Sequence, residues 1–462
     1  MTLLIPGFPQ SIGACVQDRT LERMFHDAAY PLLLWRGEAA PEKWAANIGE
    51  KQTFTRVGLI EADTDPITPG NDPTIGSYAK EQWEAEAAQF GKTIPTHLPT
   101  SVIAMAPTLM RDTQQLGLHA GLTLNRLPRN RILAAYAGGD TVVATAALAG
   151  ALAIRVASLS GFTQQIQDGF LRPVSPTNPL VISFSTAEPA NTVTGFSADN
   201  PLRPLGSGTL ILGAALGGNV ALRVGVFAAT RSRIWRVGGS ATVDGITTAN
   251  ILTAQEIINA VALLRQNRMP PHADGTYHCH LSPMAEAQLF GDNAIQRMYQ
   301  SIPDNTPFRD LIIDRKFGCT FYRNTEMPSA TSTNSTLWQA DAGGAGGAVL
   351  AREAGIEISN AAGLAIQRTI ITAGGVLVEK YIDESAFISE AGVTGKVGQF
   401  SIVNGGVAVM LDRIRFIMAA PLDALQQTIR QSWSWSGDFP CPSDALTGTQ
   451  ARFKRAIVLE HS

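Results

Sequence analysis

Charged residues are scarce in this chain. Lys and Arg total 36 and Asp and Glu total 39 among 462 residues, so charged residues make up 16% and the formal net charge is -3. An average globular protein has roughly a quarter of its residues charged. The sequence contains no run of Lys or Arg, whereas a module that grips duplex nucleic acid by charge needs a basic face. The composition therefore argues against tight, charge-driven binding of DNA. It favours a surface of which a large part contacts other protein molecules and not water.

Cysteine is rare and a hydrophobic span is missing. The four cysteines lie far apart and form no C-x-x-C pair, which argues against a disulfide framework and a structural zinc site; they are Cys15, Cys279, Cys319 and Cys441. Residues 1–10 lack a basic region and a long apolar core, so we expect no secretory signal. The uncharged stretch at residues 141–154, rich in Ala and Thr, is shorter than the roughly 20 apolar residues that a membrane span needs. A reducing, cytosolic folding environment fits these features.

Motifs for phosphate binding and nucleophilic catalysis are also missing. The glycine-rich runs at 213–218 and 343–347 lack the lysine that a P-loop requires, so we interpret them as turns. No G-x-S-x-G nucleophile elbow occurs. We therefore expect no enzymatic activity and no cofactor.

The strongest metal-site hypothesis concerns three histidines. In a strand, His278 and His280 point to the same face, and His272 lies nearby in the sequence. The competing interpretation is the polar face of a half-buried strand with Cys279 packed inward. No third ligand stands at a recognised spacing, so we predict no metal. The acidic stretch at residues 63–72 departs from the calcium-loop pattern at two positions and is interpreted as a solvated tip.

The N-terminal part of the sequence predicts an arm followed by a long loop with two extended arms, which we call the excursion. A helix is expected at 19–30, a strand at 52–60, an irregular tip rich in Pro, Gly and Asp at 63–73, and a return arm at 78–99. The two arms hold too few apolar residues to bury their aromatic side chains within the excursion. We therefore predict that a neighbouring subunit covers these side chains, which are Phe54, Trp83 and Phe90.

The remaining sequence predicts a mixed α/β body. Apolar residues at three- and four-residue spacings indicate one long helix at 107–137, which Pro128 is expected to kink or split. Residues 151–245 are rich in Ser, Thr, Val, Gly and Pro and predict an inserted β-rich subdomain. Thr253 and Glu256 have the spacing of a capping box that opens another helix. Further strands are expected at 275–281, 311–313, 318–323, 365–373, 400–403, 408–418 and 452–460, with a short helix at 283–290 and a Ser/Thr/Gly-rich loop at 329–347.

This order of elements resembles the major capsid proteins of tailed bacteriophages. Local segments carry the same resemblance: residues 127–139 (LPRNRILAAYAGG) look like the end of the family's spine helix, and 270–277 (PPHADGTY) with 281–283 look like a later block. Residues 317–326 (FGCTFYRNTE) and 453–461 (FKRAIVLEH) are also similar to one branch of that family. The resemblance covers most of the chain but not the 151–245 insertion.

The resemblance implies an α+β fold with a long spine helix, an extended β-hairpin loop, a mixed α/β axial domain and an inserted β-rich subdomain. The implied division is an N-terminal arm at 1–48, an extended loop at 49–103, a peripheral domain with the spine helix at 104–150, the insertion at 151–245, a second peripheral segment at 246–283, the axial domain at 284–400 and returning C-terminal strands at 401–462. Some relatives cross-link subunits through a lysine, and the lysines of the loop region are Lys51, Lys80 and Lys92.

The implied function is that of a structural subunit that self-assembles into the icosahedral shell around phage double-stranded DNA. The implied partners are copies of the chain in pentamers and hexamers, scaffolding, portal and decoration proteins, and packaged DNA that is contacted without specificity; no membrane is involved. The implied location is the virion, with assembly in the host cytoplasm. Two alternatives remain: a tail or fibre subunit, suggested by the β-rich insertion, and a metal-dependent enzyme centred on His278 and His280.

Overall fold

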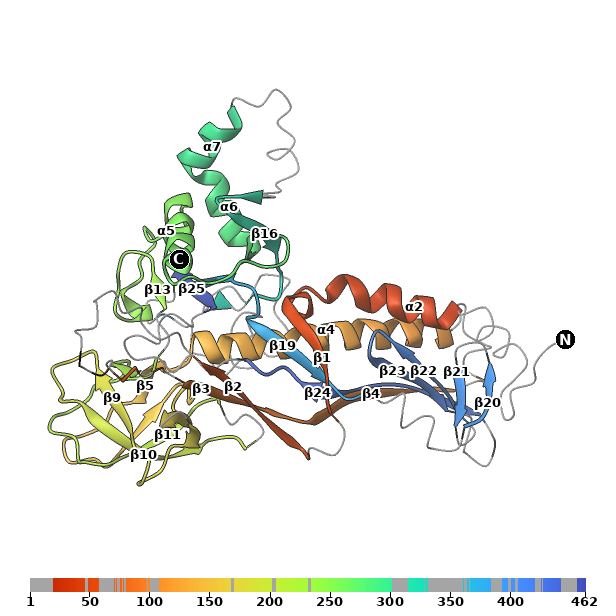
Figure 1. Ribbon diagram of the computed structural model, residues 1–462, viewed down its shortest axis with the longest axis horizontal. Helices are drawn as coiled ribbons and strands as arrows, with labels where there is room; N and C mark the ends of the chain where they lie inside the picture. Colours follow the sequence, from red (N-terminus) through yellow and green to blue (C-terminus); the bar gives the residue numbers. More distant parts are fainter. Residues whose placement is uncertain are drawn as a thin grey trace. The chain divides into compact units, whose positions relative to one another are not determined.

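Helices and sheets alternate along the chain, which confirms the expected α+β class (Figure 1). A computed structural model describes residues 20–45, 49–57, 80–97, 108–167, 170–201, 205–231, 234–300, 315–327, 329–330, 366–383, 393–397, 400–403, 406–419, 427–441 and 455–462, and single residues at 70, 72, 75, 76, 78, 99, 360, 364 and 425. The strand expected at 311–313 and most of the loop expected at 329–347 lie outside these residues.

Contacts divide the chain into two units, each assembled from segments that are distant in sequence. The first comprises Met1–Thr53, Glu84–Arg129 and Leu377–Pro440, and the second comprises Phe54–Trp83, Asn130–Val376 and Cys441–Ser462. The seven-part division implied by the family resemblance stays a prediction.

An eight-stranded sheet forms the body of the first unit. In order, its strands are β1 (Ala39–Lys43), β19 (Leu377–Tyr381), β24 (Thr428–Asp438), β23 (Ile414–Ala419), β22 (Gly406–Leu411), β21 (Phe400–Val403) and β20 (Val393–Val397). The eighth strand, β4 (Ala88–His97), lies outside this order and also pairs with β24. Along β23 the buried residues alternate with half-buried ones, as a strand with one face on a core requires.

The single strand expected at 408–418 is instead a hairpin. Strands β22 and β23 are joined by Asp412 and Arg413, whose φ angles are 43° and 68°. Positive φ at both central residues is the geometry of the tight turn that matches the twist of two antiparallel strands. This turn carries no usual signal in the sequence, because it contains neither glycine nor asparagine.

The N-terminal segment packs against this same sheet. The expected helix forms as α2 (Thr20–Ala29), followed by two short 3-10 helices, η1 (Tyr30–Leu32) and η2 (Arg36–Glu38). Strand β1 pairs in parallel with β19. The buried Arg36 donates to Glu379 at 2.6 and 2.9 Å and to the Asp412 carbonyl at 3.0 Å. A buried, multiply bonded ion pair therefore ties the N-terminal segment to the C-terminal strands of the first unit.

The expected long helix is α4 (Thr108–Tyr136), and it runs without interruption through Pro128. The predicted split at Pro128 is therefore wrong. Two glycines one turn apart let α2 lie directly against α4: a Cβ added at Gly117 would stand 2.6 Å from the Phe25 carbonyl oxygen, and one at Gly121 would stand 2.7 Å from that of Ala29. No helix in the described part of the chain combines the length and apolarity that crossing a membrane requires.

A seven-stranded sheet and three helices form one part of the second unit. The strand order is β13 (Trp235–Arg236), β25 (Ala456–His461), β18 (Ile366–Thr372), β14 (Tyr277–Leu281), β16 (Cys319–Arg323) and β15 (Arg315–Lys316), with β17 (Ser329–Ala330) pairing with β18. The helices are α5 (Ala254–Gln266), α6 (Pro283–Gly291) and α7 (Asn293–Gln300). Their shared core includes Ile257, Leu264, Cys279 and Leu289, all fully buried.

Helix α5 begins where the sequence predicted, but by a different mechanism. The Thr253 side chain makes no capping hydrogen bond, and the first free backbone N–H, that of Ala254, donates to the Asp292 carboxylate at 2.7 Å. The Glu256 carboxylate accepts from the Trp235 indole at 2.7 Å. The predicted capping box is therefore wrong, because a residue from the α6–α7 junction caps the helix instead.

The predicted β-rich insertion is a closed six-stranded barrel with its own core. The strand order is β10 (Asn191–Ala198), β11 (Gly208–Leu212), β6 (Ala153–Val156), β5 (Asp140–Thr145), β12 (Gly225–Ala228) and β9 (Leu180–Phe184). A separate ribbon joins β7 (Gln164–Gln167) to β8 (Phe170–Pro173), and η3 (Val243–Gly245) follows the barrel. Because β5 closes the barrel, the β-rich structure begins at Asp140 and not at residue 151, and its last barrel strand ends at Ala228.

Strand β25 brings a buried carboxylate between two arginines in the second unit. Glu460 is fully buried and accepts from Arg236 and Arg368, each at 2.8 Å. Arg236 also forms a fork with Asp140 at 3.1 and 3.2 Å, which links the barrel to the sheet. Burial opposes ionisation of Glu460, but the two arginines hold its pKa below the ordinary value. The cluster thus contains two buried cations and two carboxylates.

We predict that protonation of His461 in the unfolded chain weakens the fold in mild acid. Burial lowers the pKa of His461 to about 4, and its ring contacts Thr369 at 3.1 Å. The neutral ring contributes stability fully above the unfolded pKa of roughly 6.5, and this contribution is lost as pH falls from there through 4. The free energy of unfolding should fall by about 2–3 kcal/mol over that range for this group alone.

The measurement is a set of denaturant titrations at pH 7, 5.5 and 4 for the wild type and His461→Gln. The variant should lose less stability than the wild type as the pH falls, whereas His26→Gln, whose side chain is 47% exposed, should follow the wild-type profile. Parallel profiles for His461→Gln and wild type would contradict the prediction.

Candidate assembly interface

The excursion predicted after the N-terminal arm contains an isolated two-stranded ribbon. Strands β2 (Lys51–Val57) and β3 (Lys80–Glu86) pair with each other and with no further strand of the described residues. At the base of the ribbon, the Ala87 N–H donates to the Glu50 carbonyl at 2.9 Å, and exposed Lys51 lies 3.4 Å from Glu86. The Glu86 N–H also donates to the Asp438 carboxylate at 3.1 Å, and Ala85 is fully buried, so the base of the ribbon contacts its own chain. A two-stranded hairpin without further contacts is only marginally stable in water.

Two of the three predicted contact residues come together on one face of the ribbon. The rings of Phe54 and Trp83 stack with centroids 5.7 Å apart and planes 10° apart, and both side chains are half-buried. The opposite face is polar, where Gln82 donates to the Thr55 hydroxyl at 3.1 Å. The two rings contact each other but stay only half-buried, and their burial by a neighbouring subunit stays a prediction.

The third predicted contact residue, Phe90, lies elsewhere. The return arm divides at Ala87, and β4 pairs with β24 over ten residue pairs from Ala88 to His97. The Phe90 ring is half-buried with its centroid 6.1 Å from that of Trp435. The neighbour of Phe90 in its own chain comes from outside the excursion, and the sequence alone did not show that β4 joins the eight-stranded sheet. Its role between subunits stays a prediction.

The lysines of this region differ in their surroundings. Lys51 faces Glu86 across the ribbon, and Lys92 is exposed on β4. The side chain of Lys80 lies outside the described residues. Participation of any of them in a cross-link stays a prediction.

The three histidines of the metal hypothesis do gather on one face of β14. His278 and His280 both pack on the Tyr322 ring, at centroid distances of 5.0 and 5.5 Å, as strand alternation predicts. The rings of His272 and His278 stack at 3.8 Å. Cys279 is fully buried, as the competing interpretation expected.

Protein groups already contact these imidazoles. The His272 Nε2 lies 3.2 Å from the Thr372 hydroxyl, and the His278 Nε2 lies 3.3 Å from the Asp274 carboxylate. Burial opposes ionisation of Asp274, but hydrogen bonds from Thr276 hold its pKa well below the usual range. The ring contacts and the ionised Asp274 fit a structural role in the turn that precedes β14.

The glycine run at 213–218 also has an internal partner. The backbone N–H groups of Gly217 and Gly218 donate to the two carboxylate oxygens of Glu188 at 2.6 and 2.9 Å. A carboxylate of the same barrel therefore occupies the donors that a phosphate would need. This agrees with the interpretation of the run as a turn.

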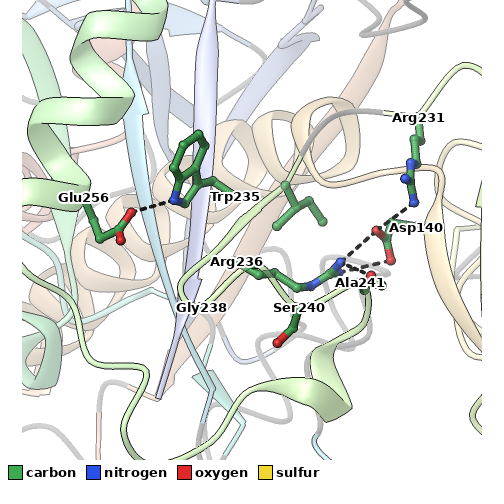
Figure 2. A pocket seen from close by; sticks show the side chains of 10 residues that line it. Asp140, Arg231, Trp235, Arg236, Gly238, Ser240, Ala241 and Glu256 are labelled. Atoms are coloured by element: carbon green, nitrogen blue, oxygen red, sulfur yellow. Dashed lines mark hydrogen bonds and ion pairs between the residues drawn. The ribbon is translucent and has the colours of Figure 1, made fainter.

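A cavity of about 500 Å³ in the second unit was not anticipated from the sequence. It lies where the barrel strand β5 meets the edge strand β13 and helix α5, and its lining includes Asp140, Arg231, Trp235, Arg236 and Glu256 (Figure 2). The available signal was three arginines within six residues around Trp235, a cluster that stands out in a chain with so few charges.

No protein-family model and no curated protein matches the sequence. Solved phage capsid structures are similar to the chain at low sequence identity. The capsid asymmetric unit of cyanophage Pam1 is 11% identical with a TM-score of 0.48, covering 92% of this chain and 89% of that chain. The capsid of cyanophage P-SCSP1u is 10% identical with a TM-score of 0.44 (92% and 86% covered), and that of Helicobacter pylori bacteriophage KHP30 is 8% identical with a TM-score of 0.42 (91% and 87%).

Proposed function

We propose that this chain is the major capsid subunit of a tailed bacteriophage, a structural protein that assembles with copies of itself into an icosahedral shell around double-stranded DNA. The observation that carries the proposal is the ribbon β2–β3, which has no third strand among the described residues and an aromatic face that is only half-buried. Such an element is stabilised when a neighbouring copy covers it, at about 25 cal/mol for each Å² of apolar surface buried.

Low charge supports the same function. With a formal net charge of -3 on 462 residues, copies approach one another without strong mutual repulsion. A heterologous contact, in which the ribbon of one copy lies on a different surface of the next, closes into rings when the rotation between copies permits. Pentamers and hexamers of this kind build a curved shell, and the wall confines DNA without binding it tightly.

The proposal assigns no catalytic role to the chain. The histidine group on β14 is engaged in protein contacts, and the barrel's glycine run binds a carboxylate of its own barrel. Scaffolding, portal and decoration proteins are proposed as further partners, with assembly in the host cytoplasm and a final location in the virion.

The test is to express the full chain and examine it by sedimentation and negative-stain electron microscopy. We expect pentamers, hexamers or rounded closed particles. Tubes or spikes would instead support a tail or fibre subunit, and a strictly monomeric protein under all assembly conditions would refute the proposal.

A further inference from the structure

The six-stranded barrel has one end at which no strand connects to the rest of the chain. The chain enters the barrel at Asp140 of β5 and leaves it at Ala228 of β12, and these antiparallel strands place both residues at the same end. At the opposite end, three loops join barrel strands to one another: 146–152 between β5 and β6, 185–190 between β9 and β10, and 213–224 between β11 and β12. We call residues 144–152 and 213–222 the barrel tip.

Backbone hydrogen bonds join the two segments of the barrel tip. Ala147 and Val220 exchange a pair of N–H···O bonds at 2.9 Å, and the Gly150 N–H donates to the Leu216 carbonyl at 2.8 Å. Leu216 and Val220 are buried in the barrel core. The tip is therefore anchored on its inner side and presents one continuous outer surface.

The outer side of the barrel tip is apolar and exposed. Ala147 and Ala151 pack against the barrel core, whereas Leu148 and Leu152 are 74% and 58% exposed. Leu222, on the second segment, is 59% exposed. Single exposed leucines are ordinary on protein surfaces, but several on two hydrogen-bonded segments form a patch of the kind that marks an interaction site.

Charge is missing from this surface. Residues 141–154 and 205–222, which include most of the barrel end, contain no Asp, Glu, Lys, Arg or His. The third loop contributes Glu188, whose carboxylate accepts from the Gly217 and Gly218 backbone N–H groups at 2.6 and 2.9 Å. The two tip segments therefore offer projecting leucines beside shallow alanine surfaces and no charge of their own. The exposed alanines are Ala144, Ala146, Ala149, Ala214, Ala215 and Ala221.

These properties favour a second copy of the barrel tip as the partner. Interfaces between identical chains are more apolar than other protein interfaces, and interface centres are depleted in charged residues. Across a two-fold axis, each residue near the axis meets its own counterpart, so a charged residue there would face a charge of the same sign. A surface without charge, in which leucines lie beside alanines, avoids that repulsion and can pack against itself.

We propose that the barrel tip is a self-association surface, on which the tip of a second copy docks across a two-fold axis and buries Leu148, Leu152 and Leu222. The inference rests on the proposed shell function, because an assembly of copies is what brings two barrels together. It deepens that function by adding a contact that does not involve the ribbon β2–β3 or its aromatic face.

The first experiment measures self-association of the full chain by sedimentation velocity. The wild type is compared with Leu148→Asp plus Leu152→Asp at the tip, and with Thr177→Asp plus Ser197→Asp, two exposed positions at the opposite end of the same barrel. Each pair adds two negative charges, so only their place differs. We expect the tip variant to associate at least about tenfold more weakly and the control to match the wild type. Unfolding midpoints of the separated subunits establish that both variants fold.

The second experiment tests whether the contact joins two tips. A chain with Leu148→Lys plus Leu152→Lys should also associate weakly, but mixing it with the tip Asp variant should restore association, because opposite charges then meet across the axis. Mixing it with Thr177→Asp plus Ser197→Asp should leave the Lys variant unassociated. Absence of recovery in the first mixture would mean that the tip meets a different surface. Equal recovery in both mixtures would mean that charge alone drives it, and either result would overturn the inference.

A lipid surface is the other class of partner that an exposed apolar tip could contact. Flotation of the wild type with phosphatidylcholine vesicles tests this alternative, and we expect no binding to the vesicles. Vesicle binding by the wild type that is lost in Leu148→Asp plus Leu152→Asp would assign the tip to a membrane and overturn the proposed contact between copies.

The outcomes separate this inference from the proposed function. A wild type that assembles together with a tip Asp variant that assembles equally well refutes the tip contact and leaves the shell function standing. A wild type that never associates refutes both.

Discussion

A variant in which residues 52–85, which include Phe54 and Trp83, are replaced by a two-residue Asn-Gly turn is expected to fold but to form no closed particles. The replacement removes most of the ribbon β2–β3, which pairs with no other described strand, and keeps β4, which pairs with β24 over ten residue pairs. The two units therefore keep their sheets, while the element that we propose to lie on the next copy is lost. Sedimentation, electron microscopy and the thermal midpoint of the subunit provide the measurements.

Point substitutions on the two faces of the ribbon give a sharper form of the same prediction. Phe54→Ser with Trp83→Ser removes the stacked aromatic face and should abolish particles, since burying each ring in a partner contributes about 1–3 kcal/mol per contact. Thr55→Ala with Gln82→Ala removes only the polar pair on the other face and should have little effect. Particles of normal yield from the aromatic double variant would rule out the ribbon as the assembly element.

Glu460 lies in the buried cluster with Arg236, Arg368 and Asp140. Among single conservative substitutions in this cluster, removal of the Glu460 charge is expected to lower the free energy of unfolding most. Glu460→Gln leaves Arg236 and Arg368 buried with one charged carboxylate between them, that of Asp140. Breaking a buried ion pair by removing one partner costs about 3–5 kcal/mol. We expect the denaturant midpoint of the variant to fall accordingly, with much of the protein insoluble at 37 °C.

The matched control is Asp199→Asn, which neutralises a carboxylate paired with Arg155 on the exposed side of the barrel. Surface ion pairs contribute about 0–1 kcal/mol, so this variant should unfold close to the wild type. Equal losses in the two variants would mean that the buried cluster contributes no more than a surface pair.

Local patterns were enough to predict many elements of the fold. Helix α4 was expected at 107–137 and forms at Thr108–Tyr136, and strand β14 was expected at 275–281 and forms at Tyr277–Leu281. Both have a strong repeat of apolar residues within one segment. The turn at Asp412 and Arg413 was not foreseen because it contains neither glycine nor asparagine. The cap of α5 was not foreseen because Asp292, which provides it, is distant in sequence.

The candidate interface was predicted in part. The sequence singled out Phe54 and Trp83 as aromatic residues without an internal core, and the structure brings them together on one face of the ribbon. It did not show that Phe90 belongs to a strand that pairs with β24, some 340 residues later. It also did not show the cavity beside Arg231, whose walls come from β5, β13 and α5.

By itself, the sequence determined the α+β class, the single long helix, the β-rich insertion and an excursion with too few apolar residues for a core of its own. These properties follow from local periodicity and composition, which act over a few residues. Only the tertiary structure decided that β5 closes the barrel, that β4 joins the sheet of the first unit, and that Glu460 lies between Arg236 and Arg368. Those outcomes depend on pairing between distant segments, where many registers satisfy the same local pattern and packing and buried charge select one.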